Sequence, residues 1–267
     1  MNKPTNDRVH IRSRRDLEKY GEDGKVQAIL DRIGVPYTGA KSVPSATCMN
    51  KHMSKKIYSD QGIKSPYGIV IKNNGDINEI TQYVFRSMPM PVVMKPVVGG
   101  SSIGVYIVNT LPKIRAALDD LFTGTDSILV EEFISGKEAT CGVVDNFRGN
   151  DIYSLLPIEI RPPENREFFD YEAKYSGETE EICPGNFSKE ETAALQKMAI
   201  EAHNSLGLRH YSRSDFIIHP KRGIYILETN SLPGLTQESL LPKSIKAIGL
   251  EYADFLDHLI ELAISDK

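Results

Sequence analysis

Apolar residues recur at helical spacing in several parts of the chain. The spacing predicts helices over residues 25–34, 44–62, 76–87, 111–122, 188–207, 237–248 and 252–264. The helix of residues 188–207 has the clearest ends, because Ser188 and Glu191 form a capping box at its start and Gly207 ends it.

Short runs rich in β-branched residues alternate with these helices. They predict strands at residues 68–71, 91–96, 105–108, 127–133, 138–146 and 153–160, and a hairpin over 211–230. A second hairpin joins residues 91–96 to 105–108 through a Gly/Ser loop. Residues 161–187 form a long polar connection, and loops of this length are usually functional or disordered. Helices mixed with hairpins predict an α+β fold rather than a simple βαβ repeat.

Composition places the chain among ordinary globular proteins. Its 267 residues are 40% hydrophobic and 25% charged, with a net charge of −4, which argues against nucleic-acid or anionic-membrane binding by bulk charge. The polar N-terminus predicts no signal peptide, and no stretch approaches the roughly 20 apolar residues of a spanning helix. Cys48, Cys141 and Cys183 are too few for a disulfide framework. We therefore expect a cytoplasmic protein without membrane or nucleic-acid partners.

The hairpin over 211–230 predicts a metal site. If residues 220–223 form the turn and His219 pairs with Ile224, Asp215 falls opposite Glu228, and Arg213 falls opposite Asn230 on the same face. Facing carboxylates repel each other, and a divalent cation would reverse that effect. Oxygen ligands of this kind suit magnesium. The alternative is a solvated face whose charges are kept apart by a different register.

The Gly/Ser loop at residues 99–104 offers a phosphate site. Its glycines let backbone N–H groups point at an anion, Ser101 and Ser102 add hydroxyls, and Lys95 precedes it as a point charge. The loop lacks the Gly-Lys-Ser/Thr ending of a Walker A motif. A flexible hairpin tip is the alternative interpretation.

Other polar residues would have a functional role only if a nucleotide binds near them. Glu131, Glu132 and Glu138 surround a strand–turn–strand and would otherwise be surface charges. Lys174 and Tyr175 lie in the long connection, which would act as a lid or would be a disordered insertion. Cys183 has no His or acid in a recognised arrangement, so a small core residue is favoured over a nucleophile.

Several segments together resemble the ATP-grasp superfamily and, within it, the D-alanine–D-alanine ligase family. The segments run in the family's order: GEDGKVQAILDRIGVPYTG, MNKHMSKK, PVVMKPVVGGSSIGV, VEEFISGKE, DYEAKY, RSD and LETNSLPGLTQESL. The resemblance implies two α+β lobes enclosing ATP. The expected division is a remnant of an N-terminal α/β domain at residues 1–40, a central lobe at 41–135, and a C-terminal lobe at 136–267 with an omega loop at 161–187.

The resemblance also implies a role for each matching residue. Lys51, Lys95, Ser101, Ser102 and Lys174 would bind phosphates, and Glu131, Glu132, Ile134 and Glu138 would hold adenine and ribose. Two magnesium ions, or manganese in their place, would bind Asp215, Glu228 and Asn230. The transition state would be stabilised by Arg213 and the Gly234 backbone, and the second amino acid's carboxylate would meet Ser239 and Leu240. Tyr175 and Ser101 would join the family's N-terminal glutamate in a hydrogen-bonded triad, which is typical of enzymes that make D-Ala–D-Ala rather than D-Ala–D-lactate.

The implied activity is that of an ATP-dependent, ADP-forming carboxylate–amine ligase in peptidoglycan biosynthesis. The first amino acid's carboxylate would take the γ-phosphate of ATP, and the second amino acid's amine would then displace that phosphate. Charge stabilisation and exclusion of water would do most of the catalysis. The resemblance also implies amino acid substrates and a homodimer.

The chain departs from the family pattern around the first amino acid. We expect a shortened N-terminal domain, because the family's opening strand and glutamate have no counterpart, its histidine before GEDG is replaced by Leu17, and its acidic flap residue is Gly99. Three explanations compete: a ligase for a different amino acid or hydroxy acid pair, a true D-Ala–D-Ala ligase whose N-terminal part is missing here or supplied by a partner, and a nucleotide-binding homologue with little ligase activity.

Overall fold

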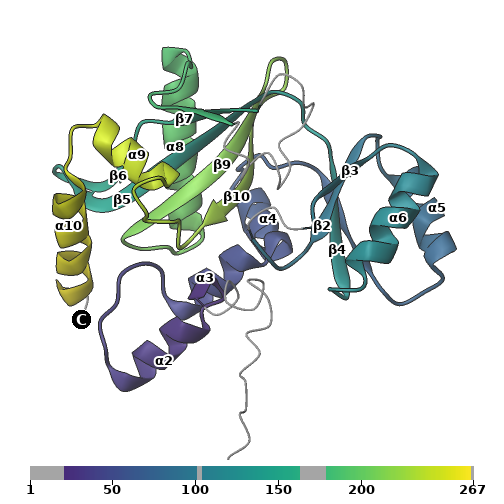
Figure 1. The fold of residues 1–267 in the computed structure, drawn as a ribbon, viewed down its shortest axis with the longest axis horizontal. Coiled ribbons are helices and arrows are strands. Elements are labelled where there is room, and N and C mark those ends of the chain that lie inside the picture. The colour runs from purple at the N-terminus through teal and green to yellow at the C-terminus, as the bar shows by residue number, and fades with distance from the viewer. Residues whose placement is uncertain (1–20, 101–103, 163–178, 266–267) are drawn as a thin grey trace, which may run out of the picture.

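A computed structural model describes residues 21–100, 104–162 and 179–265 (Figure 1). Two antiparallel sheets lie side by side, each with its own helices, and the chain passes from the first to the second after residue 132. The expected α+β architecture is confirmed. Among the described residues, no helix is both long and apolar enough to cross a bilayer.

The first sheet, seen at the right of Figure 1, has the strand order β1-β4-β2-β3. Alternation along its strands gives it two different faces. Val92 and Met94 of β2, with Ile128 and Val130 of β4, pack against the helices in one core. The intervening residues, Lys95 and Glu131 among them, lie on the opposite face. The elements are β1 (Gly68–Lys72), α5 (Ile77–Ser87), β2 (Val92–Pro96), β3 (Tyr106–Val108), α6 (Leu111–Leu121) and β4 (Ser127–Glu132).

The second sheet has the order β10-β9-β5-β7-β8, with β6 paired to β5. Successive residues of β5 enter different cores: Val143 packs with α8, and Val144 packs with α9 and α10. Helices therefore cover both faces near this end of β5. The elements are β5 (Lys137–Phe147), β6 (Asn150–Ser154), β7 (Ile158–Arg161), β8 (Glu180–Ile182), α8 (Lys189–Ser205), β9 (Tyr211–His219), β10 (Gly223–Asn230), α9 (Leu240–Ala247) and α10 (Tyr252–Ser265).

Helix α2 (Lys25–Ile33) ends at Gly34, which has the left-handed conformation (φ 69°) that glycine adopts without strain. The capping box of α8 also forms as the sequence predicts, with Ser188 accepting from the Glu191 N–H and Glu191 accepting from the Ser188 N–H.

The predicted helix over 44–62 is wrong in one respect, because it is two helices. Helix α3 (Ser42–Met49) stops at Asn50, and α4 (Lys51–Asp60) starts after it. Asn50 is extended, forms an isolated bridge to Val98, and accepts the Met53 N–H through its side chain. A cap and a bridge together satisfy backbone groups that a continuous helix would satisfy internally.

The predicted strand over 153–160 is also wrong, because it is two strands. β6 and β7 flank residues 155–157, where Leu155 is fully buried and its N–H bonds to the Gly142 carbonyl. Pro157 has no N–H for a ladder, which favours a break there.

The domain boundaries stay a prediction. Helices α3 and α4, assigned by that division to the central lobe, contact β10 and α8 of the second sheet. Tyr58, near the end of α4, is fully buried and donates to Thr229 of β10 at 2.8 Å. Helix α4 is thereby fixed to the strand that carries Glu228 and Asn230.

Candidate active site

A cavity of about 530 Å³ lies between the two sheets. This volume falls within the usual range for a small-molecule site. Most of the predicted site residues line it: Lys51, Lys95, Glu131, Glu132, Ile134, Glu138, Arg213, Asp215, Glu228 and Leu240. Residues distant in sequence, from both sheets and from α4, are therefore brought to one place.

The predicted pairing of Asp215 with Glu228, and of Arg213 with Asn230, is confirmed. The predicted turn is wrong, because His219 pairs with Gly223 instead of Ile224. A register shift between Ile226 and Glu228 leaves Leu227 without a partner and moves the remaining pairs by one residue. This bulge restores the carboxylate pair that the turn alone would have misaligned.

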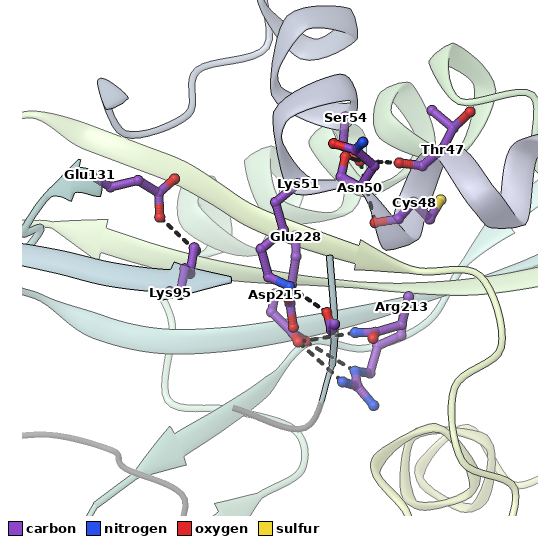
Figure 2. A network of polar contacts seen from close by, with 12 residues as sticks. Thr47, Cys48, Asn50, Lys51, Ser54, Lys95, Glu131, Arg213, Asp215 and Glu228 are labelled. Atoms are coloured by element: carbon purple, nitrogen blue, oxygen red, sulfur yellow. Dashed lines mark hydrogen bonds and ion pairs between the residues drawn. The ribbon is translucent and has the colours of Figure 1, made fainter. Parts of the chain in front are cut away.

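Asp215 is held by three neighbouring side chains, and Figure 2 shows one of them, Arg213, beside its carboxylate. Arg213 contacts both of its carboxylate oxygens, at 3.0 and 3.1 Å. Thr140, the residue opposite it on β5, donates at 2.6 Å, and the Asn230 amide donates at 3.2 Å. Burial lowers the pKa of Arg213, but the Asp215 and Glu228 carboxylates raise it more, so the guanidinium remains charged.

Glu228 is less tightly held than Asp215. Lys51 lies 4.0 Å from its carboxylate, and the Glu228 side chain is 33% exposed. Lys51 itself donates to the Gly99 carbonyl, and its backbone N–H donates to Val97 at 2.9 Å. Burial lowers the pKa of Lys51, an effect that Glu228 opposes. Glu228 therefore retains oxygens for a further ligand.

Glu131 lies buried between two lysines. Its oxygens each contact a different ammonium group at 2.5 Å, one from Lys55 of α4 and one from Lys95 of β2. Burial raises the pKa of Glu131, but the two lysines lower it more, so the net shift is downward. Glu131 thus holds lysines in this structure, and its predicted contact with adenine or ribose stays a prediction.

The other residues expected near adenine lie at the junction of the two sheets. Glu132 accepts from the Tyr67 N–H at 3.0 Å and pairs with Arg222 of the β9–β10 turn at 2.8 Å. Ile134 is buried, and Glu138 begins the pairing of β5 with β7. Glu132 and Arg222 therefore link the two sheets beside the cavity.

The residues expected to receive the second amino acid lie around the start of α9. Ser239 is the N-cap of this helix, and its hydroxyl lies 2.8 Å from that of Thr236. Gly234 is close to it, because a Cβ at Gly234 would lie 2.7 Å from the Ser239 hydroxyl oxygen. The backbone N–H groups at the start of this helix suit a carboxylate.

Four predicted residues, Ser101, Ser102, Lys174 and Tyr175, lie outside the described residues, as does Leu17. The structure adds three polar contacts that sequence reasoning missed, through Lys55, Thr140 and Arg222. Lys55 had a sequence signal, since it follows Lys51 by one helical turn. Thr140 and Arg222 are placed by pairing between strands and had none.

The donor set at Asp215, Glu228 and Asn230 fits a magnesium ion. The described residues contain no group of three His, Cys, Asp or Glu side chains placed to hold a metal. The set instead comprises two facing carboxylates and one amide oxygen, which suits an ion that completes its coordination with water and phosphate oxygens. Within the described ranges, Arg213 forms an ion pair with Asp215 and Lys51 forms one with Glu228.

Comparison with known proteins shows a consistent similarity. The family model described as the D-ala D-ala ligase C-terminus matches residues 57–261. A D-alanine--D-alanine ligase from Desulfotalea psychrophila is 39% identical over 92% of this chain and 75% of its own length. One from Syntrophobacter fumaroxidans is 39% identical over 93% of this chain and 78% of its own.

Solved structures agree with the sequence comparison. The D-alanine--D-alanine ligase of Bacillus anthracis, in a structure with ATP, has a TM-score of 0.76 and 34% identity over 92% of this chain and 76% of that one. The VanG D-Ala:D-Ser ligase of Enterococcus faecalis has a TM-score of 0.80 and 31% identity over 92% and 70%. Similarity thus extends across both sheets and the cavity between them.

Proposed function

This chain belongs to the D-alanine–D-alanine ligase family, with the ATP-grasp fold, and from that membership we propose how its residues act. It is an ATP-dependent, ADP-forming ligase that joins two amino acids. One observation supports assigning this activity to particular residues. Asp215 pairs with Glu228 beside Lys51, in a cavity between the two lobes.

The first step transfers a phosphoryl group. The carboxylate of the first amino acid attacks the γ-phosphate of ATP, forming an acyl phosphate and ADP. Lys51 and Lys95 bind the phosphates, and Asp215, Glu228 and Asn230 would hold magnesium. When bound, the metal would supply positive charge at the transferring oxygens. Arg213, fixed by two contacts with Asp215, needs no reorientation to neutralise the same charge.

The second step forms the amide. The amine of the second amino acid attacks the acyl carbon, inorganic phosphate leaves, and the amine loses a proton. The carboxylate of that amino acid would lie at the start of α9, near Ser239 and Leu240. Ser101, Ser102 and Lys174 would bind the phosphates, and Tyr175 would join Ser101 in a hydrogen-bonded triad. A cytoplasmic location, a homodimer and the absence of nucleic-acid and membrane partners belong to the same proposal.

Phosphate release tests this proposal directly. ATP, Mg²⁺ and D-alanine should give phosphate, ADP and a product with the mass of D-alanyl-D-alanine. A panel of D- and L-amino acids and hydroxy acids would identify another pair. Calorimetry with ATP and Mg²⁺ separates binding from turnover. Background hydrolysis across the whole panel would contradict the ligase assignment even if ATP binds.

A different second substrate is the other candidate. The similarity to a D-Ala:D-Ser ligase favours including D-serine in the panel. Competition between D-alanine and D-serine as the attacking amine on the acyl phosphate of D-alanine, read by mass spectrometry, would distinguish the two products.

A further inference from the structure

We infer that Lys55 is a positioning residue that fixes Lys95 against the nucleotide through Glu131. This inference rests on the proposed function only in assigning Lys95 to the nucleotide. Lys55 lies on α4, whereas Lys95 and Glu131 lie on neighbouring strands of the first sheet. One carboxylate therefore joins a lysine of the cavity wall to a helix fixed on the other lobe.

The carboxylate divides its two oxygens between the two lysines. Oε1 of Glu131 contacts Lys55, and Oε2 contacts Lys95, each at 2.5 Å. The three side chains are between 3% and 11% exposed. Lys55 also donates to the Pro66 carbonyl at 2.5 Å, a second contact that fixes its ammonium group. Because Lys55 holds one oxygen, a single oxygen remains to orient Lys95.

Helix α4 also contacts β10, the strand that carries Glu228, and this is why the Lys55 contact matters for the site. Lys51 lies one turn before Lys55 and contacts Glu228, while Tyr58 bonds to Thr229, the next residue of β10. Helix α4 thus carries one lysine toward Glu228 and another toward Glu131. Through Glu131, it sets the position of Lys95 relative to the carboxylates of β9 and β10.

Removing the Lys55 charge should alter Lys95 in a defined way. An unpaired oxygen on a buried carboxylate is costly, so Glu131 would turn to hold Lys95 with both oxygens. Lys95 would then be drawn toward the sheet and away from phosphate. We expect weaker ATP binding with little change in the affinity for the second amino acid, whose proposed site is on α9.

Three variants test this inference in the full chain. K55M should weaken ATP binding by about tenfold, the scale of one lost charge-assisted contact, and K55R should restore it to within about twofold. K56M is the matched control, because Lys56 lies on the same helix and is exposed. Calorimetry with ATP and Mg²⁺ gives affinity without turnover, so a failed ligase assay would not affect this result. If K55M does not fold by circular dichroism, K55Q replaces it.

A double variant separates positioning from general structural damage. If Lys55 acts through Glu131, adding K55M to E131Q should change ATP affinity by less than about twofold. The KM for D-alanine should stay near wild type in K55M. Equal ATP affinity in K55M and K56M, or an undiminished effect of K55M in the E131Q background, would overturn the inference.

Discussion

Asp215 lies directly opposite Glu228 although the turn that joins their strands pairs His219 with Gly223. A regular ladder from that turn would place Glu228 one position away from Asp215. The unpaired Leu227 absorbs this difference. The bulge thus brings the two carboxylates together, and their repulsion without a cation gives the site its expected dependence on metal and on both acids.

We expect Asp215→Asn and Glu228→Gln each to lower turnover by at least about 100-fold, because each removes a charge proposed to hold the metal, and Asp215 also orients Arg213. Phosphate release at saturating ATP is the measurement. Asp119→Asn is the control, since Asp119 forms an exposed pair with Arg115. Wild-type turnover in either site variant would reject the metal assignment.

Acid should destabilise the protein partly through Glu131. Its pKa is lowered in the folded state, so its stabilisation is complete above the ordinary value of 4.5 and is lost as pH falls below it. Urea unfolding between pH 6 and pH 3 should show a steeper loss for wild type than for Glu131→Gln. Parallel curves for the two proteins would contradict this origin of the acid sensitivity.

Tyr58→Phe should reduce the free energy of unfolding by about 1 kcal/mol, because it leaves a buried Thr229 hydroxyl without the Tyr58 donor. Ser214 still contacts that hydroxyl at 2.8 Å, which limits the loss. Urea denaturation measures the change. Tyr83→Phe serves as a control because Tyr83 is 55% exposed. An equal loss of stability in that variant would show that the Tyr58–Thr229 hydrogen bond is not the cause.

Gly234→Ala should raise the KM for the second amino acid by about tenfold, because its Cβ would meet the Ser239 hydroxyl oxygen at 2.7 Å. The KM for ATP should change little. Gly75→Ala is matched to it, since a Cβ there meets nothing within 4 Å. An unchanged KM for both amino acids would argue against Ser239 as part of the substrate site.

The cysteines should react slowly in the native protein. Burial raises the pKa of Cys48 and of Cys141 to about 12, so about one thiol in 10⁴ is ionised at pH 8. Cys183 is partly exposed, and burial also raises its pKa. A thiol reagent should therefore label Cys183 first and the other two on unfolding. Unchanged early labelling in Cys183→Ser would show that another thiol is exposed.

Local patterns predicted most helices and strands because their signals lie within a few residues. The capping box at Ser188 and Glu191 is one example, and the glycine end of α2 is another. The break at Asn50 was missed because its cause is a bridge to Val98, which is 48 residues away and invisible to helical periodicity.

The pairing of Asp215 with Glu228 was predicted correctly from a wrong turn. Strand alternation predicted the faces correctly. The assumed turn, with His219 opposite Ile224, gives the same pairing of Asp215 with Glu228 as the real turn combined with the bulge at Leu227. The roles of Glu131 and Lys55 could not be predicted in this way. Nothing in either segment shows that the two side chains meet, because they are 76 residues apart.

By itself, the sequence determined the alternation that places Lys95 and Glu131 on one face of their sheet, and the oxygen and lysine side chains available for nucleotide chemistry. The tertiary structure alone decided how those charges are shared: Lys55 and Lys95 divide the oxygens of Glu131, and Arg213 takes those of Asp215. Burial is the physical reason, since a charge removed from water must find its partner among whichever groups the packing of distant segments brings within reach.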